Sequence, residues 1–354
     1  MNNAWLLLVA HIALATISAG HALLYKRDPR AALGWIAVSF AYPFLGPVLY
    51  YLFGINRLRT RAHEIKGEPL RHLKLSYERP DMIKMADVVA QLPAFAAHPE
   101  LGTLARSSAA VTHRPLADGN ALQPFFEGES AYAAMLTAIN RARHSVCLAT
   151  YIFETNKVGR AFVESLAAAH ARGVEVRVLL DGIGELYSFP RAGSLLKRQG
   201  VKVARFIPPA IFPPSIHVNL RNHRKLLVVD REVGFTGGMN IGDRHLSQQP
   251  PSRRKTADIH FQVEGPIIEQ LLAAFNEDWL FAAGEASPQP LSEFASKGNA
   301  VCRVVTDGPN EDLGKLAMIM TSAVALARER VAIMTPYFLP PPELVNALQA
   351  AALR

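Results

Sequence analysis

The chain has 354 residues, a formal net charge of +8 and 50% hydrophobic residues, and its mean hydropathy is +0.11. This length holds one large domain or two ordinary ones with appendages, and the mean hydropathy is high for a purely soluble protein. The positive charge suits an anionic partner, either a phospholipid surface or nucleic acid. The two cysteines, Cys147 and Cys302, have neither C-x-x-C nor Cys/His ligand spacing, which argues for core residues and against a zinc site.

Two apolar stretches begin the chain. Residues 4–24 and residues 31–55 contain no charged residue, and the polar residues 25–30 separate them. Each stretch is long enough to cross a hydrocarbon core of about 30 Å at about 1.5 Å per helical residue. We therefore predict a two-helix transmembrane hairpin over residues 1–56.

The residues around these stretches bear on their topology. A cleaved signal peptide is the alternative for the first stretch, but no Lys or Arg precedes Trp5 and a second apolar stretch follows at once. Pro43 and Pro47 either kink the second stretch or make it re-entrant. The basic residues after it slightly outnumber those in the hairpin loop, which favours a cytoplasmic position for the rest of the chain. These residues are Arg57, Arg59, Arg61 and Lys66.

The remainder of the chain changes character near residue 119. Residues 57–118 are polar and interrupted by prolines, which predicts a juxtamembrane connector with short helical pieces. Beyond it, strand and helix patterns alternate, which favours a parallel or mixed sheet covered by helices. The expected elements are a helix over 130–142, a strand over 145–153, a helix over 157–172, a strand over 174–180 and a strand-to-helix step over 264–279.

The run of residues 207–216 is rich in proline and cannot form a helix. Because the run is apolar, it is either a loop that dips into the bilayer or a segment that packs against a second repeat later in the chain. Both alternatives stay open at this point.

The segment from His223 to Asp230 carries the most specific signal. It has the spacing H-x-K-x4-D, and a Gly-Gly-x-Asn tail follows at residues 237–240. Residues 225–230 are apolar between charged ends, which predicts a strand that places His223 and Lys225 on one face. Such a face suits phosphate, because Lys supplies charge and donors while a neutral His is a nucleophile or proton carrier. The alternative is a surface strand that happens to carry basic residues.

This pattern resembles the phospholipase D superfamily and, within it, the bacterial cardiolipin synthases. The pattern KRDPR…PFLGP…YYLFGINR over residues 26–57 is similar to their N-terminal membrane segment. The resemblance implies a phospholipase D-like mixed α/β sheet flanked by helices. Residues 119–295 would form its first repeat and residues 296–354 the start of a second. It also implies a multi-pass protein of the bacterial inner membrane.

An internal repeat stops before its second motif. Residues 150–153 precede a helix that ends at Arg172, and residues 335–338 precede a helix that ends at Arg354. His223 follows Arg172 by 51 residues (223 minus 172), so the equivalent His would fall near position 405 (354 plus 51). We therefore expect the second repeat to be incomplete and this chain to be mostly inactive by itself.

What the resemblance implies is a two-step phosphatidyl transfer through a phosphatidyl-histidine. One His attacks phosphorus and the His of the other motif protonates the leaving alcohol, because in-line displacement puts nucleophile and leaving group on opposite sides of phosphorus. His223 takes one of these two parts, and Lys225 would hold a phosphate oxygen. Asn240 and the turn at Gly237 and Gly238 would line the same pocket.

Two carboxylates complete the candidate site. Asp230 belongs to the catalytic motif, but at the end of the strand it is expected to order local structure rather than to touch substrate. Asp258 is the candidate acceptor that holds the catalytic His in one tautomer, against the alternative of an ordinary strand-edge carboxylate. The family usually has an aromatic residue just upstream, where this chain has Thr256-Ala257. His217 and His260 are expected to be core or supporting residues.

The resulting hypothesis is a membrane-bound cardiolipin synthase that joins two phosphatidylglycerol molecules and releases glycerol. No metal or cofactor is expected, because Lys and paired imidazoles neutralise the phosphate charge. The expected partners are phosphatidylglycerol and other anionic membrane lipids, and not nucleic acid. Three alternatives stay open: another phospholipase D-type phosphatidyltransferase or hydrolase, a single-motif nuclease that works as a dimer, and a non-catalytic fragment that binds anionic lipid. A homodimer would bring two motifs together.

Overall fold

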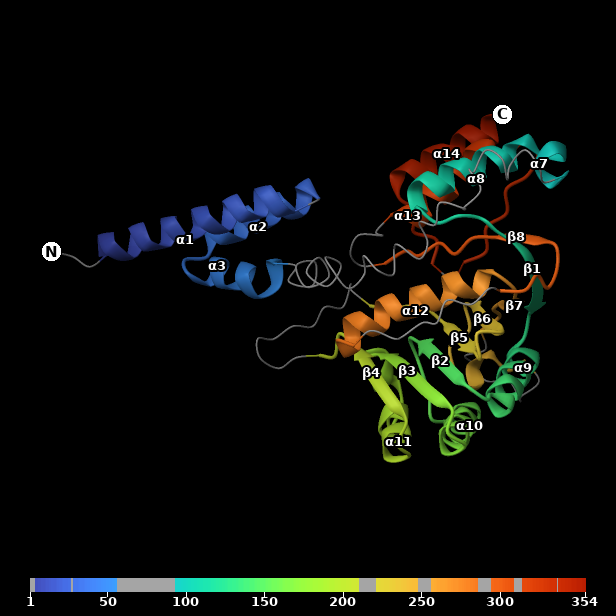
Figure 1. Cartoon of the computed structure of the whole chain (residues 1–354). Coiled ribbons are helices and arrows are strands. Elements are labelled where there is room, and N and C mark those ends of the chain that lie inside the picture. Colours follow the sequence, from blue (N-terminus) through green and yellow to red (C-terminus); the bar gives the residue numbers. More distant parts are fainter. Residues whose placement is uncertain are drawn as a thin grey trace. The chain divides into compact units, whose positions relative to one another are not determined.

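The structure is a computed structural model. It describes residues 4–26, 28–55, 93–209, 221–247, 256–285, 294–308, 314–335 and 337–354. The chain divides into two compact units, an N-terminal helical unit and a larger unit that contains the motif (Figure 1).

The N-terminal unit contains the predicted hairpin in modified form. Its elements are α1 (Ala4–Tyr25), α2 (Pro29–Ala41), α3 (Leu45–Leu49) and the π-helix η1 (Tyr50–Gly54). Within the described residues, α1 alone is long and apolar enough to cross a membrane by length and composition. The second apolar stretch is broken at residues 42–44, because Pro43 lacks the N–H that would continue the helix.

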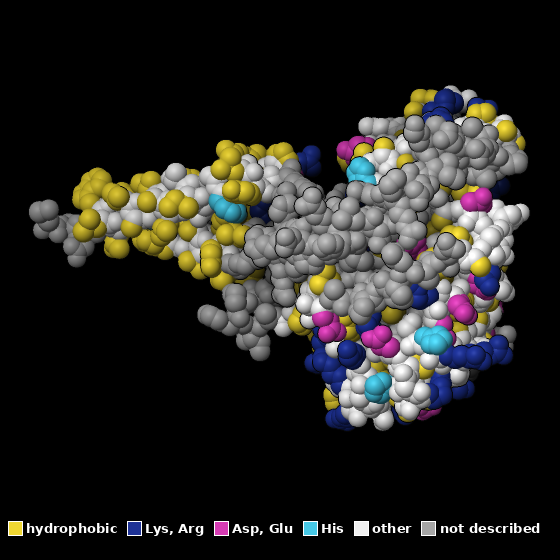
Figure 2. Space-filling view, viewed as in Figure 1, with side chains coloured by type: hydrophobic (Ala, Val, Ile, Leu, Met, Phe, Trp, Pro, Cys, Tyr) yellow, Lys and Arg dark blue, Asp and Glu magenta, His cyan; other side chains and the backbone are white. Residues whose placement is uncertain are grey.

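Polar contacts tie the two arms of this unit together. His11 Nε2 lies 3.3 Å from the Phe40 carbonyl oxygen, and His21 Nδ1 lies 2.6 Å from the Tyr50 hydroxyl. Asp28 accepts a hydrogen bond from the Arg30 backbone N–H at the start of α2. Figure 2 shows hydrophobic side chains over most of the visible surface of this unit. An outer surface of that composition suits a lipid environment.

The larger unit is built on one eight-stranded sheet in the order β4-β3-β2-β5-β6-β7-β1-β8. The pairs β2–β3 and β3–β4 are parallel and the others are antiparallel, so the predicted mixed sheet is confirmed. The strands are β1 (Ala117–Phe125), β2 (Ser145–Thr150), β3 (Glu175–Asp181), β4 (Lys202–Phe206), β5 (Leu226–Val229), β6 (Val233–Gly237), β7 (His260–Glu264) and β8 (Ala300–Cys302).

Helices cover both faces of the sheet (Figure 1). On one face lie α9 (Gly128–Arg141), α10 (Lys157–Ala171) and α11 (Ala192–Arg198), and on the other lies α12 (Ile267–Ala283). A second group packs together beyond β8. It comprises α7 (Pro93–Ala97), α8 (Pro99–Thr112), α13 (Lys315–Leu326) and α14 (Pro342–Leu353). The short 3₁₀ helices are η2 (Gly184–Tyr187) and η3 (Asp243–His245).

Local signals account for the limits of these elements. Asn156 caps α10 by accepting a hydrogen bond from the Gly159 N–H, and the chain turns at Gly173 with φ +89°. β2 and β5 are buried almost throughout, as expected of strands between two layers of helices. The core joins the inner faces of β2, β3 and β5 to α9 and α10.

The predicted elements are confirmed, but two boundaries were wrong. β2 ends at Thr150 and not at residue 153. β5 begins at Leu226, so His223 and Lys225 precede the strand and do not share one of its faces. The hydrogen-bond pairing of each strand stops where its backbone leaves the buried sheet. Residue type alone does not mark that point.

Several sequence predictions fall outside the described residues. The four basic residues after the hairpin lie there, as do residues 210–216 of the proline-rich run.

The helix expected to end at Arg354 is confirmed as α14. Cys147 is buried in β2 and Cys302 is half-buried in β8, and both are free thiols.

Candidate active site

The candidate site lies at one edge of the sheet, where several strands begin or end. β5 runs antiparallel to both neighbours, so Leu226 pairs with Ala149 of β2 and with Thr236 of β6. β7 begins beside the end of β6, since His260 pairs with Gly237. Residues just before β5 and residues just after β2 and β6 therefore meet at this edge, although they are far apart in the sequence.

His223 lies against an aromatic residue at this edge. Its ring centroid is 4.2 Å from that of Tyr151, with 31° between the ring planes, while the residue as a whole stays exposed. Burial lowers the pKa of His223 below its ordinary value of 6.5, and Lys225 lowers it further while Asp181 opposes the shift. The imidazole is therefore neutral near pH 7, which is the form that can act as a nucleophile.

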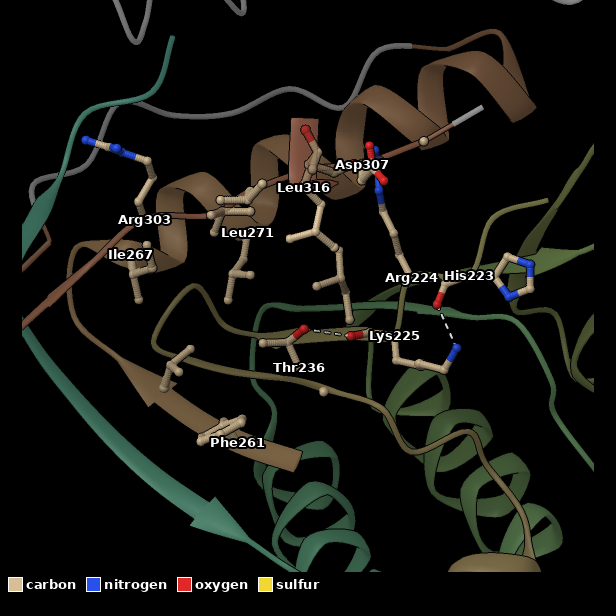
Figure 3. A pocket seen from close by; sticks show the side chains of 18 of the residues that line it. His223, Arg224, Lys225, Thr236, Phe261, Ile267, Leu271, Arg303, Asp307 and Leu316 are labelled. Carbon is tan, nitrogen blue, oxygen red and sulfur yellow. Dashed lines mark hydrogen bonds between the residues drawn. The ribbon is translucent and has the colours of Figure 1, made fainter. Parts of the chain in front are cut away.

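Lys225 lies beside the same aromatic ring, and Figure 3 shows its side chain turned back toward the His223 backbone. Its Nζ donates a hydrogen bond to the His223 carbonyl oxygen at 2.6 Å and lies 5.8 Å from the centroid of Tyr151. Burial lowers the pKa of Lys225 to about 8, although Asp258 opposes that shift. The amine is thus still mostly protonated at pH 7. The Lys225 carbonyl oxygen accepts a hydrogen bond from Thr236 Oγ1, which joins the start of β5 to the end of β6.

The segment just before β5 is fixed by buried carboxylates. Asp181, at the end of β3, accepts a hydrogen bond from the Asn222 N–H at 3.1 Å and pairs with Arg221 at 3.6 Å. Asp278 of α12 accepts a hydrogen bond from Asn222 Nδ2 at 2.7 Å and pairs with Arg224 at 2.6 Å. The two carboxylates therefore fix the backbone on both sides of the candidate histidine.

The Gly-Gly turn allows two backbone segments to approach closely. A Cβ on Gly238 would lie 2.0 Å from Asp258 Oδ1, and a Cβ on Gly237 would lie 2.5 Å from the Ile259 carbonyl oxygen. Any side chain at these positions would displace the strand that follows. The pair of glycines therefore brings Asp258 to the edge of the sheet that holds Lys225.

Asp258 acts mainly on groups other than the histidine it was predicted to orient. Its Oδ1 accepts a hydrogen bond from the Ile259 N–H at 2.8 Å, and its charge raises the pKa of Lys225 and of His245. Within the described residues, the carboxylate that acts on the pKa of His223 belongs to Asp181. The orienting role of Asp258 stays a prediction.

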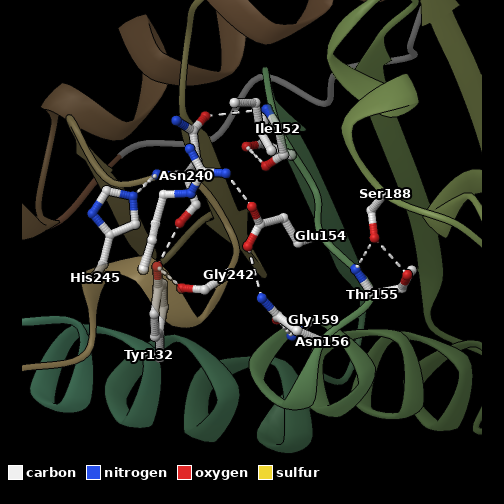
Figure 4. A network of polar contacts seen from close by, with 12 residues as sticks. Tyr132, Ile152, Glu154, Thr155, Asn156, Gly159, Ser188, Asn240, Gly242 and His245 are labelled. Atoms are coloured by element: carbon white, nitrogen blue, oxygen red, sulfur yellow. Dashed lines mark hydrogen bonds and ion pairs between the residues drawn. The ribbon is translucent and has the colours of Figure 1, made fainter. Parts of the chain in front are cut away.

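Asn240 is a structural link between strands (Figure 4). Its Oδ1 accepts a hydrogen bond from the Ile152 N–H at 3.1 Å, which joins the end of β2 to the Gly-Gly-x-Asn tail. Its N–H donates to His245 Nε2 at 3.2 Å, and its carbonyl oxygen accepts from the Tyr132 hydroxyl at 2.5 Å. The Asn240 amide is thereby held in place at the edge of the site.

Asp230 lies at the far end of β5. Its carboxylate accepts hydrogen bonds from the backbone N–H groups of Arg143, His144 and Ser145 at 2.8, 2.7 and 2.8 Å. These three donors belong to the turn between α9 and β2. The motif carboxylate therefore orders that turn, and the length of β5 separates it from His223.

Residues 135–279 match the family model described as the cardiolipin synthase, phospholipase D-like domain. Residues 4–54 match the phospholipase D-nuclease N-terminal family. The chain is 30% identical over 346 residues to cardiolipin synthase A of Pseudomonas fluorescens (strain SBW25), which covers 96% of this chain and 70% of that protein. The chain belongs to the cardiolipin synthase family.

Other relatives agree with this assignment. Cardiolipin synthase 1 of Bacillus cereus is 29% identical over 342 residues, covering 93% of this chain and 65% of that protein. Among solved structures, the phosphatidylserine synthase of Haemophilus influenzae Rd KW20 has a TM-score of 0.50 at 12% identity, covering 70% of this chain and 63% of that one. That likeness shows the phospholipase D fold alone.

A cavity of about 970 Å³ adjoins the motif of this cardiolipin synthase family member (Figure 3). His223 and Lys225 lie on its lining, together with Arg224 and Asp307. Most of the remaining lining is apolar and comes mainly from β7, α12, the segment after β8 and the start of α13. It includes Phe261, Val263, Ile267, Leu271, Val304 and Leu316. A mostly apolar cavity that also presents polar side chains is typical of a ligand site.

Sequence reasoning missed two residues of this family member's site. Tyr151 was assigned only to a strand, and Asp181 only to a strand end, yet they contact His223 and its supporting backbone. The Asp-Gly pair at the end of β3 was the available signal, since carboxylates at strand ends often serve a site. His260 is buried in β7, where burial lowers its pKa to about 4. His217 lies outside the described residues.

Proposed function

We propose that this protein transfers phosphatidyl groups and acts as a cardiolipin synthase on phosphatidylglycerol. The observation that carries the proposal is a neutral His223 beside a cationic Lys225 at one end of an apolar cavity. A lipid phosphate needs a cation and a nucleophile at the same point, and its acyl chains need an apolar surface next to that point.

The chemistry divides into two displacements at phosphorus. In the first, an imidazole nitrogen of His223 attacks the donor phosphorus, the bond from phosphorus to the glycerol oxygen breaks, and an acid donates a proton to the departing glycerol. In the second, the free hydroxyl of an acceptor phosphatidylglycerol attacks the phosphatidyl-histidine, loses its proton to the same group, and the phosphorus–nitrogen bond breaks. Lys225 stabilises the charge on the phosphoryl oxygens in both displacements.

The acid of the first displacement lies outside this motif. H-x-K-x4-D occurs once in the 354 residues, and a single imidazole cannot attack phosphorus and protonate a leaving group on its opposite side. The proposed source is the histidine of a second motif, supplied by a second copy of this chain or by an extension of it. The low activity proposed for the isolated chain follows from the same need for a second imidazole.

The proposed location is a bacterial inner membrane, with two membrane-embedded arms and the larger unit on the cytoplasmic side. The apolar length of α1 and the hydrophobic surface of the N-terminal unit support membrane association. The same lipid environment supports phosphatidylglycerol and anionic lipids as partners, in preference to nucleic acid.

A trapping experiment tests the covalent step. The purified chain is mixed with phosphatidylglycerol that carries radiolabelled phosphate and is then quenched in alkali, where a phosphohistidine survives. The expected result is label on His223 and none in a His223→Ala variant. Label on another residue, or label that persists in His223→Ala, would contradict the proposed nucleophile. The labelled lipid product distinguishes a hydrolase from a synthase. Transfer to water gives phosphatidic acid, and transfer to phosphatidylglycerol gives cardiolipin.

A further inference from the structure

A short loop beside the candidate histidine exposes apolar side chains. The loop covers residues 186–190 and follows β3 through the 3₁₀ helix η2. Leu186 is 47% exposed, Tyr187 is 59% exposed and Phe189 is 93% exposed. Exposed apolar residues that cluster on one loop indicate a contact surface, whereas single exposed residues do not.

This loop is held firmly in place. The Ser188 hydroxyl accepts a hydrogen bond from the Thr155 N–H at 2.8 Å and lies 2.7 Å from Thr155 Oγ1, which also donates to the Pro190 carbonyl oxygen at 2.9 Å (Figure 4). On the other side, buried Glu185 accepts a hydrogen bond from the Gly193 N–H at 3.0 Å. Hydrogen bonds of the Ser188, Thr155 and Glu185 side chains thus fix the loop, while its apolar side chains stay in solvent.

Ring contacts connect the loop with the site. Tyr187 lies 6.3 Å from Tyr151 between ring centroids, and Tyr151 lies 4.2 Å from His223. A Cβ on Gly184 would lie 1.7 Å from the Tyr151 carbonyl oxygen, so the start of the loop packs directly on the residue that supports the histidine. Tyr187 therefore lies next to the aromatic residue that contacts His223, which places this loop beside the site.

We infer that residues 186–190 insert into the headgroup region of a lipid bilayer and hold the opening of the site at the level of the lipid phosphates. Tyrosine is favoured at membrane interfaces because an apolar ring carries a polar hydroxyl, and phenylalanine and leucine because their apolar side chains reach the acyl boundary. Exposed Arg191, the next residue, adds positive charge that suits anionic headgroups. The inference rests on the proposed function, since only a membrane lipid substrate requires the site to face a bilayer.

The test measures the depth of the loop in the full chain. Phe189→Cys and, separately, Tyr187→Cys are made in a Cys302→Ser background, where the remaining Cys147 is buried, and are labelled with an environment-sensitive fluorophore. Leu353→Cys is the matched control, because Leu353 is 90% exposed on the last turn of α14. The proteins are reconstituted in vesicles of phosphatidylglycerol and phosphatidylcholine and probed with two quenchers, aqueous iodide and a nitroxide on the lipid acyl chain.

Insertion predicts that iodide quenching at positions 187 and 189 is about fivefold weaker than at position 353, with strong quenching by the lipid nitroxide. Strong iodide quenching at both loop positions would overturn the inference. Protection from both quenchers would overturn it as well, because protein would then cover the loop. The readout needs no turnover, and repeating it with His223→Ala separates failure of the loop inference from failure of the proposed chemistry.

Discussion

His223 and Lys225 take their chemical character from partial burial. Burial is the largest cause of the lowered pKa of each residue. A neighbouring charge also shifts each pKa: Lys225 lowers that of His223, and Asp258 raises that of Lys225. Lys225 disfavours a second positive charge on His223, while Asp258 keeps Lys225 protonated. The pair therefore combines a neutral imidazole with a cation over a limited range of pH.

The pH dependence of kcat/KM should have two limbs. Activity falls on the acid side as pH drops through the pKa of His223, which lies below 6.5, because the imidazole becomes protonated. Activity falls on the alkaline side as pH rises through about 8, because Lys225 loses its charge. Asp258→Asn removes the carboxylate that raises the pKa of Lys225, so the alkaline limb should move to lower pH.

Rate profiles of the wild type, Asp258→Asn and Glu232→Gln check this prediction. Glu232 is an exposed carboxylate just beyond the far end of β5 and serves as the control. An alkaline limb that stays in place in Asp258→Asn would contradict the assignment of Lys225. Unchanged rates in the same variant at neutral pH would also rule out Asp258 as the residue that orients the histidine.

Asp230 should matter for stability more than for chemistry. Asp230→Ala leaves three backbone N–H groups of the α9–β2 turn without their acceptor. We expect the free energy of unfolding to fall by about 2 kcal/mol, and Asp230→Asn, which keeps one acceptor oxygen, to lose less. Urea titrations monitored by circular dichroism measure this. Loss of activity in Asp230→Ala without loss of stability would instead indicate a direct part in catalysis.

At the scale of elements, the site depends on the meeting of strand ends. α9 contributes through Tyr132, whose hydroxyl donates to the carbonyl oxygens of Asn240 and Gly242 at 2.5 and 3.2 Å. Removing that hydroxyl frees the loop after β6 from the helix. The position of the Asn240 amide near the end of β2 then depends on fewer contacts.

Tyr132→Phe should lower the free energy of unfolding by about 1 kcal/mol and reduce kcat through the loosened loop. Thr137→Ala is the matched control, because it also removes one hydroxyl from α9, on the exposed face, where it bonds only within the helix. Denaturant titration and steady-state rates test both variants. Equal effects in the two variants would show that the loop contact has no special importance.

The sequence predicted the elements of the sheet better than the contacts of the site. The apolar runs of β2, β3 and β5 were recognised because buried strands have a simple pattern. The role of Asp181 was not, because its contacts to Arg221 and Asn222 bridge about 40 residues and follow from strand order, which local patterns do not encode. A kink or re-entrant turn at Pro43 was predicted, since proline cannot donate the helical hydrogen bond, and the helix is broken there.

At the scale of the whole molecule, the chain combines a hydrophobic N-terminal unit with a larger unit that carries one phospholipase D-type motif. The chain spans 70% of the length of its relative from Pseudomonas fluorescens. The proposed phosphatidyl transfer needs two imidazoles at one phosphorus, so assembly of two motifs is the central requirement of the proposal.

The most direct test is mass spectrometry of lipids after the purified chain is incubated with phosphatidylglycerol in mixed micelles. His223→Ala is run beside it, and the oligomeric state is measured in the same detergent. The account predicts that any cardiolipin formed depends on His223 and appears only in a fraction where two motifs are present together. Cardiolipin from a strict monomer of these 354 residues, or cardiolipin that persists in His223→Ala, would contradict it.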